Sequence, residues 1–354
     1  MGTNLYKYGM STPYISVEGE PALNAVFSAE CDAVVQNVQD LPDRGKLRYI
    51  HLTDIHIGAH LDENRYQCLI AVAKMVKMLA LDFVLITGDV IAGANGSAEI
   101  QKAGLLEVKK IFSSCDVPVI ISRGNHDDNS LIAAGNDAPT PENVVSNRWW
   151  NWNMGTVFGK ASNRFVAPVG ENGYFYVDIQ EKKVRIVNIN CSDLTEQERL
   201  ETGGQNWLKV SQEQLAWLTN TAFAVEDGWK IICACHMVPV PAMATGKYIV
   251  NSAEVYEVLK PIADKLIAYH AGHKHVSCNH VDDNGIRFVM ANTCGGSVVK
   301  ATDRNPGYGF SSVSKEARET YPTGAMLFDI CIVNQDDTVS RVRWGAKDDV
   351  FRDV

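Results

Sequence analysis

Residues 47–58 read Leu-Arg-Tyr-Ile-His-Leu-Thr-Asp-Ile-His-Ile-Gly, and the interpretation of the whole chain begins from them. The first six residues have the apolar character of a buried strand, and Asp54 and His56 follow just past its expected end. In an α/β protein, ligands and reactive groups collect at the carboxyl edge of the strands. An aspartate and a histidine two residues apart can hold a cation, but many loops contain both by chance. The pair therefore predicts a metal site only if other parts of the chain supply further ligands.

The composition is that of a globular protein with one large domain or two ordinary ones: 354 residues, 46 % hydrophobic and 21 % charged. A net charge of −9 argues against nonspecific binding to nucleic-acid backbone, so we do not expect a nucleic-acid polymer as a partner. The charge still allows an anionic substrate, because bound divalent metals reverse the local sign.

Cysteine usage and the lack of targeting signals indicate the cytoplasm. The nine cysteines are scattered, and several lie in apolar, strand-like surroundings, which favours reduced buried thiols over a disulfide framework. The N-terminus shows no signal-peptide pattern, and no run of about 18 apolar residues is present. We therefore expect a cytoplasmic protein without a membrane-spanning segment.

Hydrophobic periodicity predicts an α/β fold. Helical spacing at 66–79 and 98–112 alternates with buried strands at 83–86 and 117–121, which implies parallel pairing with right-handed crossovers. Later strands are predicted at 174–179, 184–189, 230–235, 266–269, 278–281, 286–291, 325–333 and 339–344. We expect residues 1–45 to form an N-terminal extension with one or two short elements, packed on a main domain of residues 46–354. The main domain then carries an insertion at about 129–170 and ends in the strands after about 324.

The insertion contains three indoles in four residues, Trp149, Trp150 and Trp152. A long irregular segment inside a compact domain often serves function. It can form a wall or lid for a substrate, or a satellite hydrophobic cluster, and the sequence does not decide between the two.

Polar residues follow five of the predicted strands, and Asp54 and His56 are therefore not isolated. The further candidates are Asp89, Asn125 with His126, His236, and His273 with His275. Carboxylate, imidazole and amide oxygen together suit Mn, Zn or Fe better than calcium. Seven metal-binding side chains are too many for one ion, so two ions that share one carboxylate fit better. Two metals about 3.5–4 Å apart are a known device for displacement at phosphorus, in which a metal-bound hydroxide attacks in line with the leaving group.

The ordered set of motifs resembles the signature of the calcineurin-like metallophosphoesterases. It comprises Asp54-Ile55-His56, Gly88-Asp89, Gly124-Asn125-His126-Asp127, His236 and Gly272-His273-Lys274-His275, and it spans residues 54 to 275. The resemblance implies a sandwich of two mixed β-sheets flanked by helices, a four-layer αββα arrangement. It does not cover the first 45 residues, the tryptophan-rich insertion or the region after about 292.

The resemblance also implies a role for each position. Asp54, His56 and His275 would hold one metal ion, and Asn125, His236 and His273 the other, with Asp89 bridging them. His126 would contact the phosphate and protonate the leaving oxygen as general acid. Asp127 would orient that imidazole, although a simple turn residue is an equal alternative. Gly88, Gly124 and Gly272 fit sharp turns that bring backbone close to the metals.

The remaining candidates are weaker. We expect His51 to be a packed core histidine, and His60 and His270 to be either structural or supporting groups near the ligands. His280 has no visible partner. One of Arg304, Tyr308 and Phe310 could contact the non-reacting part of a substrate.

The sequence thus predicts a dinuclear metal-dependent phosphoesterase acting on a small phosphate ester. A phosphodiester of nucleotide-like or small-molecule type is favoured, because the aromatic insertion is compatible with stacking of a base. A phosphomonoesterase and a non-catalytic binding or scaffold module of the same fold are the alternatives. The oligomeric state stays open.

Overall fold

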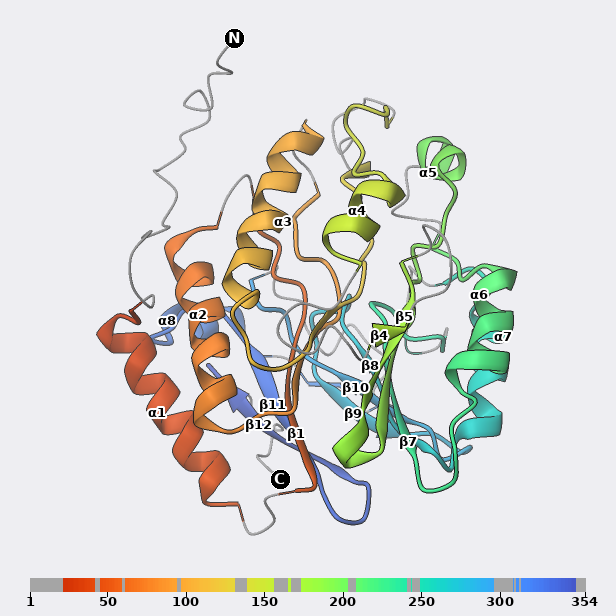
Figure 1. Ribbon diagram of the computed structural model, residues 1–354. Coiled ribbons are helices and arrows are strands. Elements are labelled where there is room, and N and C mark those ends of the chain that lie inside the picture. Colours follow the sequence, from red (N-terminus) through yellow and green to blue (C-terminus); the bar gives the residue numbers. More distant parts are fainter. Residues whose placement is uncertain are drawn as a thin grey trace.

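Two β-sheets pack face to face, and helices cover both outer faces (Figure 1). The computed structural model describes residues 22–41, 45–58, 61–93, 97–130, 139–155, 165–166, 173–202, 208–240, 243, 249–295, 308, 310–311 and 313–347. The helices are α1 (Ala25–Gln39), α2 (Glu63–Met78), α3 (Ala98–Phe112), α4 (Asn147–Asn153), α5 (Glu196–Thr202), α6 (Gln212–Trp217), α7 (Ser252–Leu259) and α8 (Lys315–Thr320).

The first sheet has the strand order β12-β11-β1-β2-β3. Its strands are β1 (Leu47–Leu52), β2 (Phe83–Ile86), β3 (Val119–Ile121), β11 (Phe328–Val333) and β12 (Val339–Trp344). The strands β1, β2 and β3 are parallel, as the alternation of strands and helices predicted. The strand β11 runs antiparallel beside β1, so the last strand pair completes the sheet that the first strand begins.

The second sheet has the strand order β4-β5-β6-β7-β8-β10-β9. Its strands are β4 (Phe165–Val166), β5 (Phe175–Ile179), β6 (Val184–Asn188), β7 (Lys230–Ala234), β8 (Leu266–Ala271), β9 (Cys278–Val281) and β10 (Arg287–Met290). Parallel pairs β6–β7 and β7–β8 lie in its middle, and antiparallel hairpins lie at its edges. The predicted class, two mixed sheets flanked by helices, is confirmed.

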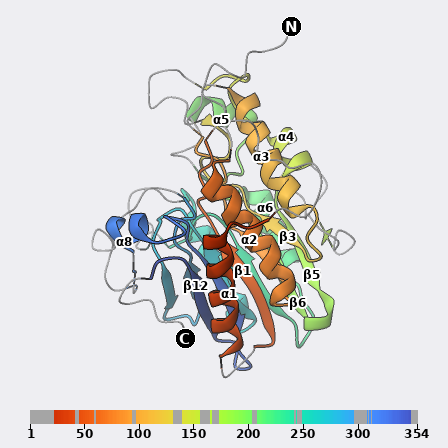
Figure 2. The same cartoon turned by 90° about the vertical axis from the view of Figure 1, so that its left-hand side faces the viewer.

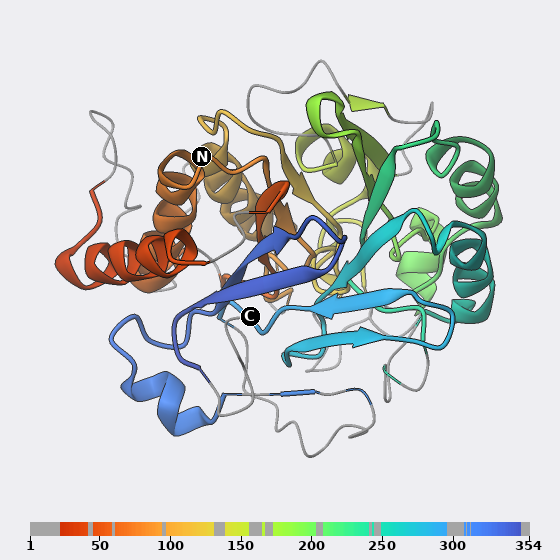
Figure 3. The ribbon, with the colours of Figure 1, turned by 90° about the horizontal axis from the view of Figure 1, so that it is seen from below.

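Three apolar layers follow from the alternation of side chains along the strands. The layer between the sheets includes Tyr49 and Phe83, whose rings stack 4.4 Å apart, opposite Ile186 and Ile232 of the second sheet. The outer layers lie under α1, α2 and α3 on one side and under α6 and α7 on the other, as Figures 1 and 3 show.

The N-terminal region contains a longer element than we predicted. In place of one or two short elements, α1 forms a 15-residue helix that packs against α2 and β12 (Figure 2). Its buried residues are Phe27, Cys31, Val34, Val35 and Val38, which have helical spacing. This periodicity was the signal in the sequence that the prediction missed. The Asn24 side chain caps the helix by accepting the backbone N–H of Phe27 at 3.0 Å.

The tryptophans of the insertion divide between core and surface. Trp150 on α4 is buried in the core of the first sheet, and Trp149 packs against the same core. Trp152 is 73 % exposed. The hydrophobic-cluster interpretation therefore holds for Trp149 and Trp150, while Trp152 remains available to a ligand. Residues 131–138, 156–164 and 167–170 of the predicted insertion lie outside the described residues. Among the described helices, none has the length and apolar character needed to cross a membrane.

Candidate metal centre

Loops after five strands bring the predicted ligands together. β1, β2 and β3 of the first sheet lead to Asp54 and His56, to Asp89, and to Asn125 with His126. The strands β7 and β8 of the second sheet lead to His236 and to His273 with His275. The strands are parallel within each sheet, so their carboxyl ends lie together there. Contacts of His236 with Asp89 and of His275 with Asp54 place these ends of both sheets at one edge.

Asp54, His56 and His275 form the first cluster of possible ligands. The Nε2 atoms of the two histidines lie 3.1 Å apart. Asp54 Oδ1 lies 3.2 Å from His275 Nε2 and 3.5 Å from His56 Nε2. Neighbouring ligands of one ion at about 2.1 Å are about 3 Å apart, so these three atoms are spaced for a shared ion.

Asp89, His236 and His273 form the second cluster, and Asn125 lies within it. His236 Nε2 is 3.1 Å from Asp89 Oδ2 and 3.0 Å from Asn125 Oδ1. His273 Nδ1 is 2.9 Å from the same Asn125 oxygen. Asp89 Oδ2 also lies 3.9 Å from His56 Nε2, which belongs to the first cluster. The Asp89 carboxylate is therefore placed between the two clusters.

The backbone at the ligands is strained. Nine described non-glycine residues have positive φ, and five of them are Asp54, His56, Asp89, His273 and His275. Left-handed backbone is uncommon outside glycine and costs free energy, and such residues gather at functional sites. The sequence contained no signal of this feature.

Two glycines allow the loops to approach closely. A Cβ on Gly124 would overlap Asp89 Oδ1 and the Asp89 backbone nitrogen. A Cβ on Gly272 would overlap Thr53 Oγ1 and come within 2.5 Å of Asp54 Oδ2. Both glycines are thus needed for space next to a candidate ligand, in agreement with the prediction that they bring backbone near the metals.

A protein-family model described as calcineurin-like phosphoesterase matches residues 47–277, a range that includes every candidate ligand. The chain belongs to that family. Metal-dependent hydrolysis of phosphoric esters is accordingly its class of activity. No curated protein matches the sequence.

Three solved structures resemble the phosphoesterase at low sequence identity. A dimetal phosphatase from Danio rerio is 14 % identical with a TM-score of 0.56, over 88 % of this chain and 98 % of that chain. GAP50, the anchor in the inner membrane complex of Plasmodium, is 12 % identical with a TM-score of 0.44, over 83 % of each chain. A phosphopantetheinyl hydrolase from Mycobacterium tuberculosis is 11 % identical with a TM-score of 0.39, over 75 % and 95 %. The first of these likenesses supports the fold.

The electrostatics of the phosphoesterase site favour added positive charge. Burial lowers the pKa of His236, but the adjacent Asp89 carboxylate outweighs burial and raises this pKa to about 10. Burial raises the pKa of Asp54, but His275 and His56 hold it well below its usual range. Asp89 behaves in the same way beside His236 and His126. Without a metal ion, a proton on His236 supplies positive charge beside the carboxylates, and a metal ion can replace that proton.

A metal ion would also supply a partner for a buried oxygen atom that has no hydrogen bond. Asp54 Oδ1 is buried and has no hydrogen-bond partner, and a buried carboxylate oxygen without one costs free energy. The donor atoms of both clusters are carboxylate and amide oxygens and imidazole nitrogens, which suit Mn, Zn or Fe. The residues present therefore fit two transition-metal ions.

Asp127 makes contacts other than the one we predicted. Its carboxylate accepts the backbone N–H groups of Gly124 at 2.7 Å, Asp89 at 2.9 Å and Ile91 at 3.1 Å. The His126 imidazole instead contacts the Ala92 carbonyl oxygen through Nδ1 at 2.6 Å. The contact of Asp127 with Gly124 is local to the turn, whereas its contacts with Asp89 and Ile91 join this loop to the loop after β2. The group that contacts the His126 imidazole through Nδ1 is the Ala92 carbonyl oxygen.

A hydrogen-bonded chain behind the ligands was largely missed by sequence reasoning. His236 Nδ1 contacts the Thr87 carbonyl oxygen at 2.7 Å, and the Thr87 hydroxyl contacts His51 at 2.9 Å. His51 and His270 meet through their Nδ1 atoms at 3.1 Å, and His270 Nε2 meets the Tyr49 hydroxyl at 2.7 Å. All five residues are buried. The His236 contact is a supporting interaction of the kind that orients ligating histidines.

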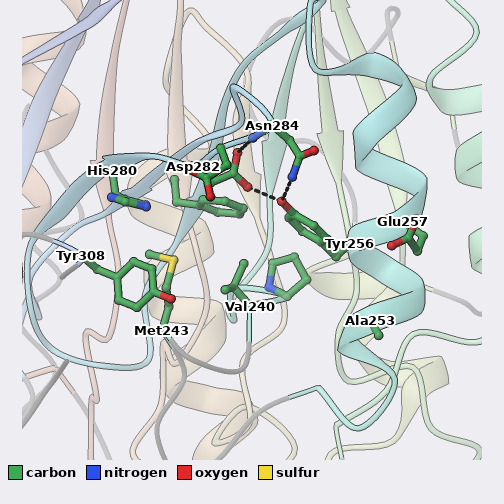
Figure 4. Close-up of a pocket in the computed structure, with 12 residues that line it drawn as sticks. Val240, Met243, Ala253, Tyr256, Glu257, His280, Asp282, Asn284 and Tyr308 are labelled. Atoms are coloured by element: carbon green, nitrogen blue, oxygen red, sulfur yellow. Dashed lines mark hydrogen bonds between the residues drawn. The ribbon is translucent and has the colours of Figure 1, made fainter.

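His280 and Tyr308 line a separate hollow of about 620 Å³ on the outer side of the second sheet, shown in Figure 4. His280, for which we saw no partner in the sequence, packs edge-on against the Tyr308 ring, with the ring centroids 4.9 Å apart. Tyr308 and Phe310 pack against the core of this sheet. His60 and Arg304 lie outside the described residues.

Proposed function

We propose that the chain is a dinuclear phosphoesterase in which Asp89 is shared by two metal ions. In this assignment Asp54, His56 and His275 hold one ion, and Asn125, His236 and His273 hold the other. When bound, two divalent ions neutralise the phosphate oxygens and lower the pKa of an attacking water. The observation that carries the proposal is the position of Asp89, with His236 Nε2 at 3.1 Å and His56 Nε2 at 3.9 Å from one carboxylate oxygen.

His126 is the proposed general acid. Its backbone N–H donates to Asp89 Oδ1 at 2.8 Å, which fixes the residue beside the shared carboxylate. Because Nδ1 faces the Ala92 carbonyl oxygen, Nδ1 carries a proton, and Nε2 is the ring nitrogen that is free to act on a substrate. Nε2 lies 3.7 Å from Asp89 Oδ2, and the side chain is 25 % exposed, so a substrate can reach it. The protonated imidazole donates its Nε2 proton to the departing oxygen.

A small phosphodiester is the proposed substrate class, and a cytoplasmic location is proposed with it. The support for a diester is Trp152, an aromatic side chain 73 % exposed on α4. The first residue of α4, Asn147, accepts a hydrogen bond at 2.7 Å from Arg123, which precedes Gly124 and Asn125. An exposed indole on a helix tied to the site can stack on a base or another flat group of a diester.

The test is hydrolysis of bis(4-nitrophenyl) phosphate and 4-nitrophenyl phosphate by metal-free protein reconstituted with Mn, Zn, Fe, Ni or Mg. We expect activity with at least one transition metal and faster turnover of the diester. Faster turnover of the monoester would replace the proposed substrate class with the phosphomonoester. Absence of activity under every metal, in protein shown to bind two ions, would favour a binding module.

A further inference from the structure

Two buried arginines hold the ends of the loop that carries Asn125 and His126. Arg123 directly precedes this loop, and Asp128 directly follows Asp127. Asp128 forms an ion pair with Arg199 of α5, in which the two side chains are 1 % and 0 % exposed. The pair joins residues 71 positions apart in the chain.

Asn147 connects the two arginines. Its Oδ1 accepts a hydrogen bond from Arg123 Nη1 at 2.7 Å and another from Arg199 Nη2 at 2.8 Å. Asn147 is the first residue of α4, and Figure 1 shows α4 and α5 at the same end of the molecule. We call Arg123, Asp128, Asn147 and Arg199 the loop clamp.

Further contacts fix the clamp on both sides. Arg199 also donates to the hydroxyl and the carbonyl oxygen of Ser192, each at 3.0 Å. The Asp128 carbonyl oxygen accepts the backbone N–H of Val145 at 2.8 Å. The Arg123 guanidinium lies 5.2 Å from the centroid of the Trp150 ring. A shift of the loop would break several of these directional contacts at once.

We propose that Asn147 and Arg199 are positioning residues: through Arg123 and Asp128 they set the place of Asn125 as a metal ligand and of His126 as a proton donor. Both parts rest on the proposed function, which assigns Asn125 as a metal ligand and His126 as the general acid. Guanidinium groups bind in a fixed planar geometry, so a buried network of them specifies one arrangement of the chain. Catalytic groups displaced by about 1 Å can lose about 100-fold in rate, which gives the clamp a functional effect beyond stability.

The decisive variant is the double substitution Asp128→Asn with Arg199→Met. Removing the two charges of this ion pair together leaves the net charge of the buried cluster unchanged, and replacement of a whole ion pair is often tolerated by the fold. The matched control is Asp178→Asn with Arg185→Met, which removes another paired aspartate and arginine, at the hairpin end of β5 and β6. Arg199→Lys keeps the charge without the planar geometry and should fall between the wild type and the double variant.

The first readout compares bis(4-nitrophenyl) phosphate, which has a good leaving group, with diphenyl phosphate, which needs protonation. We expect the clamp variant to lose about tenfold more activity on diphenyl phosphate than on the nitrophenyl ester, because His126 is displaced. The control should keep the wild-type ratio. A folded clamp variant with the wild-type ratio would overturn the role for His126, provided that His126→Ala changes the ratio.

The second readout is Mn²⁺ affinity, which depends on Asn125 and not on proton transfer. We expect the clamp variant to bind the ion about tenfold more weakly than wild type, and the control variant to bind normally. If His126→Ala leaves the ratio of the two activities unchanged, the assignment of His126 as general acid is wrong. The positioning role of Asn147 and Arg199 is then decided by Mn²⁺ affinity alone. Wild-type affinity in the folded clamp variant would overturn that role, provided that Asn125→Ala weakens Mn²⁺ binding; if Asn125→Ala binds normally, the ligand assignment of the proposed function is wrong instead.

Discussion

The phosphoesterase contains histidines in two different surroundings. At the metal centre His56, His236 and His275 lie within 4 Å of the Asp54 or Asp89 carboxylates. Between the sheets His51 and His270 face each other, Tyr49 and Thr87. The pKa of His236 is raised to about 10, whereas burial, with the Arg341 charge, lowers the pKa of His51 to about 3. For His236, the neighbouring Asp89 carboxylate outweighs burial and makes the site favourable for positive charge.

The largest expected effect on activity comes from removing a histidine of the metal centre. His236→Ala should lower phosphoester hydrolysis by more than about 100-fold, because outer groups around a metal already account for about 10- to 100-fold. Activity with added metal and metal content by mass spectrometry measure the effect. His270→Gln, which changes a buried histidine between the sheets, is the control and should keep both metal ions. Full activity and metal content in His236→Ala would remove His236 from the ligand set.

The contrast also predicts how metal affinity depends on pH. Because the pKa of His236 is raised to about 10, its proton must leave when a metal binds below that pH. The affinity for Zn²⁺ should therefore rise by about tenfold per pH unit between pH 6.5 and 8.5. Competition titrations against a chelating dye at several pH values measure this slope. An affinity independent of pH would mean that His236 is neutral before the metal binds.

The space beside Asp89 can be tested by adding one methyl group. Gly124→Ala places a Cβ against Asp89 Oδ1 and should destabilise the protein by about 1–3 kcal/mol, as overpacking does. Gly58→Ala is the control, because a Cβ there meets no atom within 4 Å. Urea unfolding of both variants gives the comparison. Equal stability of the two variants would show that the loops relax around Gly124 freely.

The histidines between the sheets predict a smaller, pH-dependent effect on stability. The pKa values of both histidines are lowered in the folded protein. Below about pH 6.5, the pKa of a histidine in the unfolded chain, the unfolded chain therefore binds more protons than the folded protein. Each should cost about 2 kcal/mol of stability between pH 7.5 and pH 5, and the full stability returns above pH 6.5. Denaturant unfolding at both pH values should show a weaker pH dependence in His51→Gln with His270→Gln. The same dependence in wild type and variant would place the titrating groups elsewhere.

The sequence predicted the strands and their ends better than it predicted the surroundings of the ligands. Asp89 and His236 were found because each lies just after a run of apolar residues that must be a buried strand: His236 follows its run directly, and Asp89 follows after Thr87 and Gly88. The left-handed backbone at His273 and His275 depends on packing between loops and has no pattern along the chain. The contact of Asp128 with Arg199 spans 71 positions, so no local spacing indicates it. The core role expected for His51 agrees with its burial.

The pairing of β1 with β11 has a consequence for synthesis of the protein. Residues 47–52 leave the ribosome early, yet their antiparallel neighbour at residues 328–333 is made about 280 residues later. Until then the edge of β1 has open backbone groups that can pair with other chains, and Asp54 and His56 follow that edge directly. A chain cut before residue 328 keeps all seven candidate ligands but lacks β11, the antiparallel neighbour of β1. Such a fragment should therefore be prone to aggregation even though its metal-binding residues are complete.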